Sequence, residues 1–270
     1  MKKLVSLIII LLFIGVAIAP SIDASDDLVE LDVEFCGLGR KHTIQLTQQE
    51  ADEVEQLFVD IEQKLSEAET REEAEIIFKE TVVELDRFGL LGGMSVEQAQ
   101  SLVTGKEHNP VVVKLFEIFY KRNHEKIGNN TNILCLIAGI TDYTWFIGPI
   151  MWSFLILLFK INSEVLYFIL LSLFLSYSIF LTIFPMAFGY NIYVGNDDTH
   201  PAYGWLSTIG LNGKKSWNGP FIGNITRLKL IEWLEGLGVV GFTGIKIYFQ
   251  PGQIGFYFGS ALWVKIEEVD

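Results

Sequence analysis

Hydrophobic residues are spaced in two ways along the first half of the chain, and each spacing predicts a different element. Apolar and acidic side chains alternate over residues 29–35, the period of a half-buried strand, and glycines then predict a turn into a second strand at 43–46. Further on, apolar residues recur at helical spacing after four residues that are typical helix caps. These caps are Thr47, Thr70, Ser95 and Asn109. The pattern predicts a β-hairpin followed by four helices.

The last eighty residues have a different pattern, rich in glycine and aromatic side chains. Apolar residues alternate with others over 245–249 and again over 254–266, and the turn-forming pair Pro251 and Gly252 lies between them. This spacing predicts an antiparallel pair of strands. Residues 224–235 fit neither the helical nor the strand period, so both interpretations stay open there.

Two long apolar runs, residues 133–159 and 165–189, separate these regions. A bilayer core needs about 20 apolar residues per helix, so each run is long enough for one transmembrane helix. The segment between them, residues 160–164, is too short for a domain. The runs are therefore expected to form an antiparallel transmembrane hairpin.

The amino terminus has the features of a secretory signal peptide. Lys2 and Lys3 precede an apolar run over residues 4–19, which ends among small residues. An uncleaved anchor is the alternative, because the run is close to the shortest length that spans a bilayer. In both cases the following domain is expected outside the plasma membrane, together with the carboxy-terminal domain, in a multi-pass protein.

These elements predict an α+β membrane protein with four parts. Residues 1–24 are the signal peptide or anchor, and residues 25–130 form a small acidic α-helical domain with a β-hairpin outside the cytoplasm. Residues 133–189 form the two-helix transmembrane hairpin. Residues 190–270 form a mainly antiparallel β domain rich in glycine and aromatic residues.

Composition and charge narrow the choice of partners. Half of the 270 residues are hydrophobic, and the formal net charge is −13. Residues 25–110 hold 21 acidic and 7 basic side chains, which accounts for the whole excess. Nucleic-acid binding needs clustered Lys and Arg, so nucleic acid is excluded as a partner. The expected partners are the lipid bilayer and other membrane or envelope proteins.

Two cysteines and two glycosylation triplets offer sites for covalent modification. Cys36 and Cys135 could form one disulfide in an exported protein, but two unrelated buried thiols are the favoured interpretation. The triplets Asn-X-Thr place Asn129 and Asn224 as glycosylation candidates.

The sequence contains no recognised catalytic, phosphate-binding or zinc-binding motif, and no catalytic residue or cofactor is expected. Asp142 is unusual because a carboxylate inside a membrane span is costly. At the edge of the predicted span it is expected to cap the helix, and a role in an ion pathway is the alternative. Asn196, Asp197 and Asp198 offer oxygen ligands for calcium, but an ordinary surface turn is favoured over a metal site.

Two segments resemble uncharacterised archaeal membrane proteins that have an exported helical domain and a glycine- and aromatic-rich β region. These segments are residues 88–105 (FGLLGGMSVEQAQSLVTG) and 241–247 (GFTGIKI). The resemblance implies an archaeal envelope protein, and it implies no mechanism and no residue roles.

Two functions from different classes are expected. The first is a non-enzymatic binding, scaffolding or assembly module displayed outside the cell. The alternative is a membrane-embedded enzyme or transport component that uses Asp142 with Asp197, Asp198 and His200. The alternative requires these four side chains to converge on one cavity.

Overall fold

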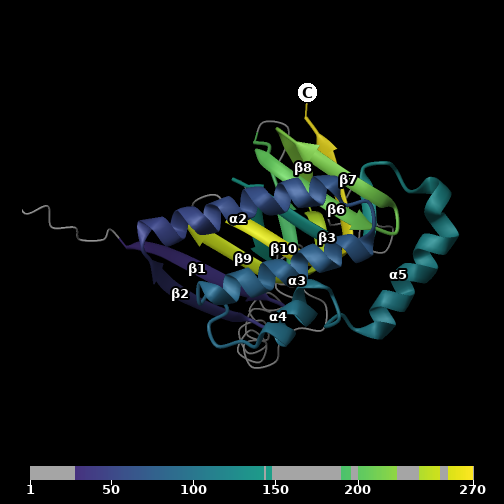
Figure 1. The fold of residues 1–270 in the computed structure, drawn as a ribbon. Helices are drawn as coiled ribbons and strands as arrows, with labels where there is room; N and C mark the ends of the chain where they lie inside the picture. Colours follow the sequence, from purple (N-terminus) through teal and green to yellow (C-terminus); the bar gives the residue numbers. More distant parts are fainter. Residues whose placement is uncertain are drawn as a thin grey trace, which may run out of the picture.

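The computed structural model describes residues 28–142, 144–147, 190–195, 200–223, 237–249 and 255–269, which form an α+β fold (Figure 1). An antiparallel sheet of ten strands carries helices on one face. The strands are β1 (Val29–Cys36), β2 (Arg40–Leu46), β3 (Thr131–Thr141), β4 (Thr144–Ile147), β5 (Tyr190–Val194), β6 (Gly204–Gly210), β7 (Gly213–Asn218), β8 (Phe221–Gly223), β9 (Leu237–Phe249) and β10 (Gly255–Glu268). The helices are α2 (Gln48–Glu67), α3 (Arg71–Arg87), α4 (Val96–Val103), α5 (Pro110–Asn123) and the 3₁₀ turn η1 (His124–Lys126).

The sheet joins the two ends of the chain. Its strand order is β2-β1-β9-β10-β3-β6-β7, while β5 pairs with β4 and β9, and β8 pairs with β10. β1 pairs with β2 on one edge and with β9 on the other, where Leu31 lies opposite Phe249. The amino-terminal hairpin is therefore part of the same sheet as the carboxy-terminal strands.

The helix starts predicted from the capping residues are confirmed. Thr47 and Thr70 each accept a hydrogen bond from the backbone N–H at the third helical position, and a glutamate at that position completes both capping boxes. Ser95 caps α4 and Asn109 caps α5 through their side chains. The hairpin of β1 and β2 and the antiparallel pair of β9 and β10 are also confirmed.

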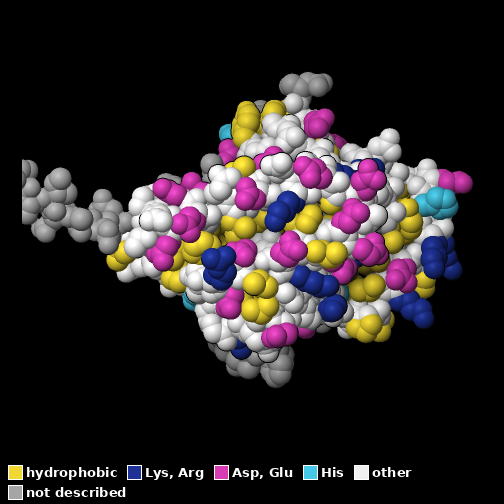
Figure 2. All heavy atoms as spheres, viewed as in Figure 1, with side chains coloured by type: hydrophobic (Ala, Val, Ile, Leu, Met, Phe, Trp, Pro, Cys, Tyr) yellow, Lys and Arg dark blue, Asp and Glu magenta, His cyan; other side chains and the backbone are white. Residues whose placement is uncertain are grey.

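Aromatic contacts fasten the helices to the sheet. α2 and α3 lie across one face of it (Figure 1). Phe58 of α2 stacks on Phe256 with ring centroids 4.0 Å apart and meets Phe249 edge-on at 5.9 Å. Phe78 of α3 meets Phe258 edge-on at 5.3 Å. The outer surfaces of α2 and α3 carry many Asp and Glu side chains (Figure 2), so the apolar stripe of each helix faces the sheet and the acidic stripe faces outward.

The other face of the sheet holds a second buried cluster. It includes Cys135 and Ile137 of β3 and Tyr257 of β10, covered by residues of β5 and β8 such as Ile192 and Phe221. β3 therefore contributes to both cores, because Leu136 and Ala138 belong to the cluster beneath the helices.

This double burial corrects the predicted membrane hairpin. Residues 131–141 form the central strand β3 and residues 144–147 form β4, so the first predicted span begins as β-structure. A strand covered on both faces is apolar at nearly every position, and over a short window it cannot be told from a buried helix. Residues 148–189 and the signal segment 1–24 lie outside the described residues.

The predicted fold class is therefore wrong. A strand of an α+β fold, β3, occupies positions that the hydropathy pattern predicted as a membrane helix. Of the helices described here, none is both long and apolar enough to cross a bilayer. The predicted multi-pass location in the plasma membrane depended on that helical hairpin. This prediction is contradicted by the same finding.

The stacking of Phe58 predicts a large effect on stability. Phe58 is only 2% exposed, so Phe58→Ala removes its stack on Phe256 and leaves a cavity between α2 and the sheet. The expected loss in the free energy of unfolding is about 3–5 kcal/mol. Urea denaturation followed by circular dichroism measures it.

Leu115→Ala is the matched control, because Leu115 is 60% exposed on α5. Its expected effect is within about 0.5 kcal/mol. Equal losses for the two variants would contradict the packing of α2 described above.

Candidate functional site

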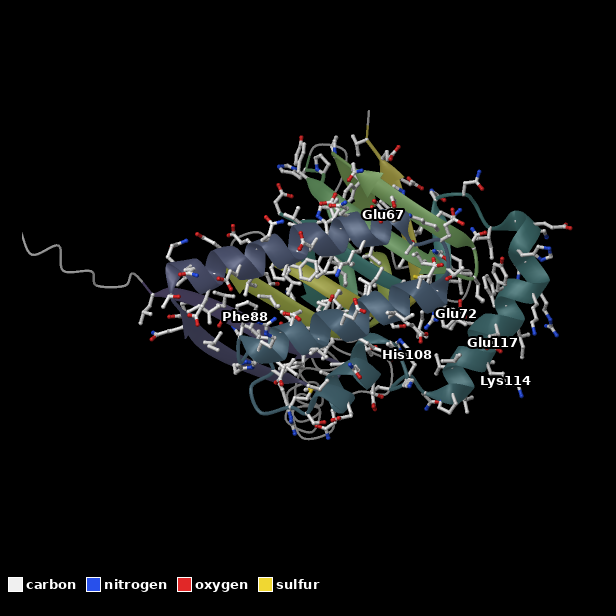
Figure 3. All side chains as sticks on the ribbon, in the orientation of Figure 1. Glu67, Glu72, Phe88, His108, Lys114 and Glu117 are labelled. Atoms are coloured by element: carbon white, nitrogen blue, oxygen red, sulfur yellow. The ribbon has the colours of Figure 1, made fainter. Side chains whose placement is uncertain are left out.

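A cleft lies where the start of α3, the first half of α5 and the sheet meet. Its volume is about 370 Å³, within the range of roughly 300–1,000 Å³ that is typical of small-ligand sites. Figure 3 labels three of its residues, Glu72, His108 and Glu117, around the gap between α3 and α5. The full lining is Arg71, Glu72, Gly105, His108, Val113, Glu117, Leu134, Gly210, Leu211 and Ser260.

Arg71 fixes the wall of the cleft. It is the first residue of α3, directly after the cap Thr70. Its Nε donates to Glu75 Oε1 at 3.2 Å, its Nη1 donates to the carbonyl of Leu134, and its Nη2 donates to the carbonyl of Thr104 at 3.3 Å. These contacts join α3 to β3 and to the end of α4. The guanidinium is therefore a clamp between elements, and it pairs with Glu75, whose other oxygen pairs with Lys79 at 3.8 Å.

The backbone at Leu134 is strained where it meets this clamp. Among the described non-glycine residues, Leu134 alone has a positive φ, of 47°. Such a conformation costs a leucine roughly 1–2 kcal/mol. Strained residues of this kind concentrate at binding sites, where surrounding contacts hold them in place. Here the hydrogen bond from Arg71 holds the Leu134 carbonyl at the edge of the cleft.

Gly105 allows the loop between α4 and α5 to approach the sheet. Its φ is +78°, which favours glycine, and a Cβ at this position would lie 3.0 Å from Cδ2 of His108 and overlap Oγ of Ser260. A side chain at residue 105 would therefore separate the loop from β10. Gly105 therefore also brings His108 to the cleft.

His108 is held between two hydroxyl groups. Its Nε2 lies 3.3 Å from Ser260 Oγ and 3.4 Å from Thr243 Oγ1. The Ser260 hydroxyl donates to the Cys135 carbonyl at 3.4 Å, and the Thr243 hydroxyl donates to the Leu102 carbonyl at 3.2 Å. The imidazole, the two hydroxyl groups and the two carbonyl oxygens therefore form one buried hydrogen-bonded cluster.

Burial argues against nucleophilic catalysis by Ser260. A nucleophilic hydroxyl must be accessible to its substrate. Ser260 is only 2% exposed. The cluster of His108, Ser260 and Thr243 is therefore a buried polar anchor that ties the loop before α5 to β9 and β10.

Burial sets the charge of His108. Desolvation, and then the nearby Arg71 charge, lower the pKa of His108 to about 4, so the ring is neutral at pH 7. Arg71 pairs with Glu75. Glu72 and Glu117 form no ion pair with other described residues, and both line the cleft. The cleft is therefore net negative at neutral pH and favours a positively charged group.

The residues singled out from the sequence lie elsewhere. Asp142 follows β3 instead of opening a helix: its backbone N–H donates to the Tyr203 carbonyl at 3.1 Å, and its Oδ1 accepts from the Tyr203 N–H at 2.7 Å. Asp142 and His200 are exposed, and neither lines the cleft. The structure gives Asp142 a local structural role at the end of a strand.

Most of the other candidate ligand and glycosylation residues fall outside the part of the chain that the structure describes. Asn196, Asp197, Asp198 and Asn224 lie outside the described residues. Within the described ranges, no group of three or more His, Cys, Asp or Glu side chains is arranged to hold a metal ion. Asn129 is exposed in the turn before β3.

Cys36 and Cys135 are buried free thiols in the second core. Burial raises the pKa of Cys135 to about 12 and also raises that of Cys36. Thiolates are the reactive form, so both side chains are inert at neutral pH.

Sequence reasoning missed the cleft because its parts are far apart in the chain. His108 and Ser260 are separated by 152 residues, and each is unremarkable in its own segment. The one local signal was the sequence from Gly105 to Asn109, a helix stop followed at once by a helix cap, which forces a sharp turn around His108.

Comparison with known proteins gives no relative from which roles could be transferred. The sequence matches no protein-family model, no curated protein and no solved structure. The assignment of residues in the cleft therefore rests on geometry and charge alone.

His108 predicts a pH dependence of stability. The unfolded chain protonates it near the ordinary pKa of 6.5, whereas the folded protein protonates it only near 4. Between these values the unfolded state binds more protons. The contribution of the neutral His108 side chain to the free energy of unfolding is therefore complete above about pH 6.5 and is lost as the pH falls to about 4. It amounts to at most about 3 kcal/mol. Urea denaturation of His108→Gln is expected to show a smaller loss on acidification than the wild type.

His124→Gln is the control, at an exposed position after α5. It is expected to keep the wild-type pH dependence. A His108→Gln curve parallel to the wild type from pH 7 to about 4 would rule out the buried neutral imidazole.

Proposed function

We propose that the protein is a binding module whose cleft between α3 and α5 takes an alkyl chain ending in an ammonium or guanidinium group. The observation that carries this is the pair of carboxylates, Glu72 on α3 and Glu117 on α5, which outnumber Arg71, the one cation in the described lining of the cleft. A cation placed in the cleft is attracted by both carboxylates, whereas an anion placed there would be repelled by them.

The apolar part of the lining fits the alkyl chain of such a ligand. Val113 of α5, Leu134 of β3 and Leu211 of the turn between β6 and β7 are among the lining residues. A Lys or Arg side chain buries its methylene groups against apolar surface while its charged end stays near water and carboxylates. The cleft offers both surfaces within one volume of about 370 Å³.

The charge of the whole protein favours the same ligand class. The net charge is −13, and Asp and Glu cover the outer surfaces of α2 and α3 (Figure 2). A field of this sign raises the local concentration of cations and the rate at which they associate. Association is therefore expected to weaken as salt is added, because salt screens exposed charges.

The ligand's chemistry could come from two sources, a free amine or the basic side chain of a partner protein. Both present a charged group on a methylene chain. Titration by isothermal calorimetry with cadaverine tests the first source, and titration with a short Lys-rich peptide tests the second. The same peptide acetylated on every lysine is the control, because acetylation removes the charge and keeps the chain.

Two carboxylates predict a graded loss of binding. Glu72→Gln and Glu117→Gln are each expected to weaken binding of the better probe by roughly two- to fivefold, since ion pairs near a surface contribute about 0.2–1 kcal/mol. The double variant is expected to weaken it by about tenfold. Calorimetry at low ionic strength measures all three.

Glu55→Gln is the matched control, because Glu55 is an exposed acid of α2 that does not line the cleft. It changes the net charge equally and is expected to leave affinity nearly unchanged. Equal weakening by Glu55→Gln and Glu72→Gln would mean that only the overall field attracts the ligand. Equal binding of the acetylated peptide would overturn the proposal.

A further inference from the structure

A second cavity lies at the other end of α5 and has the opposite charge. Its volume is about 350 Å³, and it lies between the end of α5, η1 and strands β3 and β10. Its lining contains two lysines, Lys126 and Lys265, and no acidic residue. In a protein with a net charge of −13, such a lining is unusual.

One wall of this cavity is aromatic and contains a buried donor without a partner. Trp263 of β10 meets Phe119 of α5 edge-on, with ring centroids 5.7 Å apart. Trp263 is 8% exposed, and its buried Nε1 makes no hydrogen bond among the described residues. A flat ring placed against this wall buries apolar surface and packs edge-on or offset against the two aromatic side chains.

The charges around the cavity favour an anion. Lys265 Nζ pairs with Glu267 at 3.0 Å, and Lys126 makes no ion pair within the described chain. The carboxy-terminal end of α5 contributes a partial negative charge of about half an elementary charge. The ammonium group of Lys126 outweighs this, so the described lining offers one uncompensated cation beside an aromatic wall.

We infer that this cavity binds a small organic anion that carries a flat apolar group, of the class of aromatic carboxylates. The ring of the ligand lies against Phe119, Ile127 and Trp263, all of which line the cavity. Its carboxylate pairs with the Lys126 ammonium, which also lines the cavity, and such charge-assisted hydrogen bonds are the stronger kind. This site is separate from the cleft between α3 and α5, so the two proposals stand or fall independently.

The indole N–H provides a direct readout. In ¹H–¹⁵N spectra of the full chain, the resonance lost in Trp263→Phe identifies the Nε1 signal of Trp263 among the 6 tryptophans. Titration with benzoate is expected to shift this signal in a saturable way. Benzamide has the same ring and no charge, and inorganic phosphate has charge and no ring. Both are expected to bind more weakly than benzoate.

The variant Lys126→Gln tests the charge without touching the aromatic wall. It is expected to weaken benzoate binding by roughly tenfold while the spectrum stays that of a folded protein. Lys121→Gln is the matched control, because Lys121 is an exposed lysine of α5 that does not line the cavity. It is expected to leave the benzoate affinity unchanged.

Three results would overturn the inference. The first is a Trp263 signal that does not move with benzoate at millimolar concentration. The second is benzamide binding as tightly as benzoate, which would mean that only the ring is recognised. The third is equal weakening by Lys121→Gln and Lys126→Gln, which would mean that general charge attraction explains the effect.

Discussion

The structure depends on the burial of its central strands on both faces. β9, β10 and β3 lie in the middle of the sheet, with the aromatic contacts of α2 and α3 on one side and the cluster under β5 and β8 on the other. Both cores therefore share the same backbone, and neither can form without it. The Arg71 clamp bonds to β3, the His108 anchor contacts β9 and β10, and both cavities are lined in part by residues of β3 and β10.

The sequence predicted local structure well where the signal is local. Thr47 and Thr70 mark helix starts because a cap and its partner lie within one turn, and the strand pair of β9 and β10 is visible in its alternation. Pairing between distant segments leaves no such mark. Nothing near Leu31 indicates that it lies opposite Phe249, and nothing near His108 indicates Ser260.

The misassigned hairpin has a physical explanation in β3. Hydropathy reports how apolar a segment is, and it does not report whether protein or lipid covers it. Leu136 and Ile137 point to opposite cores, so the alternation that identifies a half-exposed strand is lost. The same property that makes β3 central made it resemble a membrane helix, whereas the half-exposed β1 kept its alternation and was identified correctly.

The pairing of β1 with β9 has a consequence during synthesis. The amino-terminal hairpin and helices leave the ribosome about 150 to 200 residues before their partner strands β9 and β10, at roughly 5–20 residues per second. For that interval the inner edge of β1 and the apolar stripes of α2 and α3 have no sheet to cover them. The nascent chain can then aggregate through that strand edge. Its acidic surface repels other copies of the chain and keeps them apart until β9 and β10 have been synthesised.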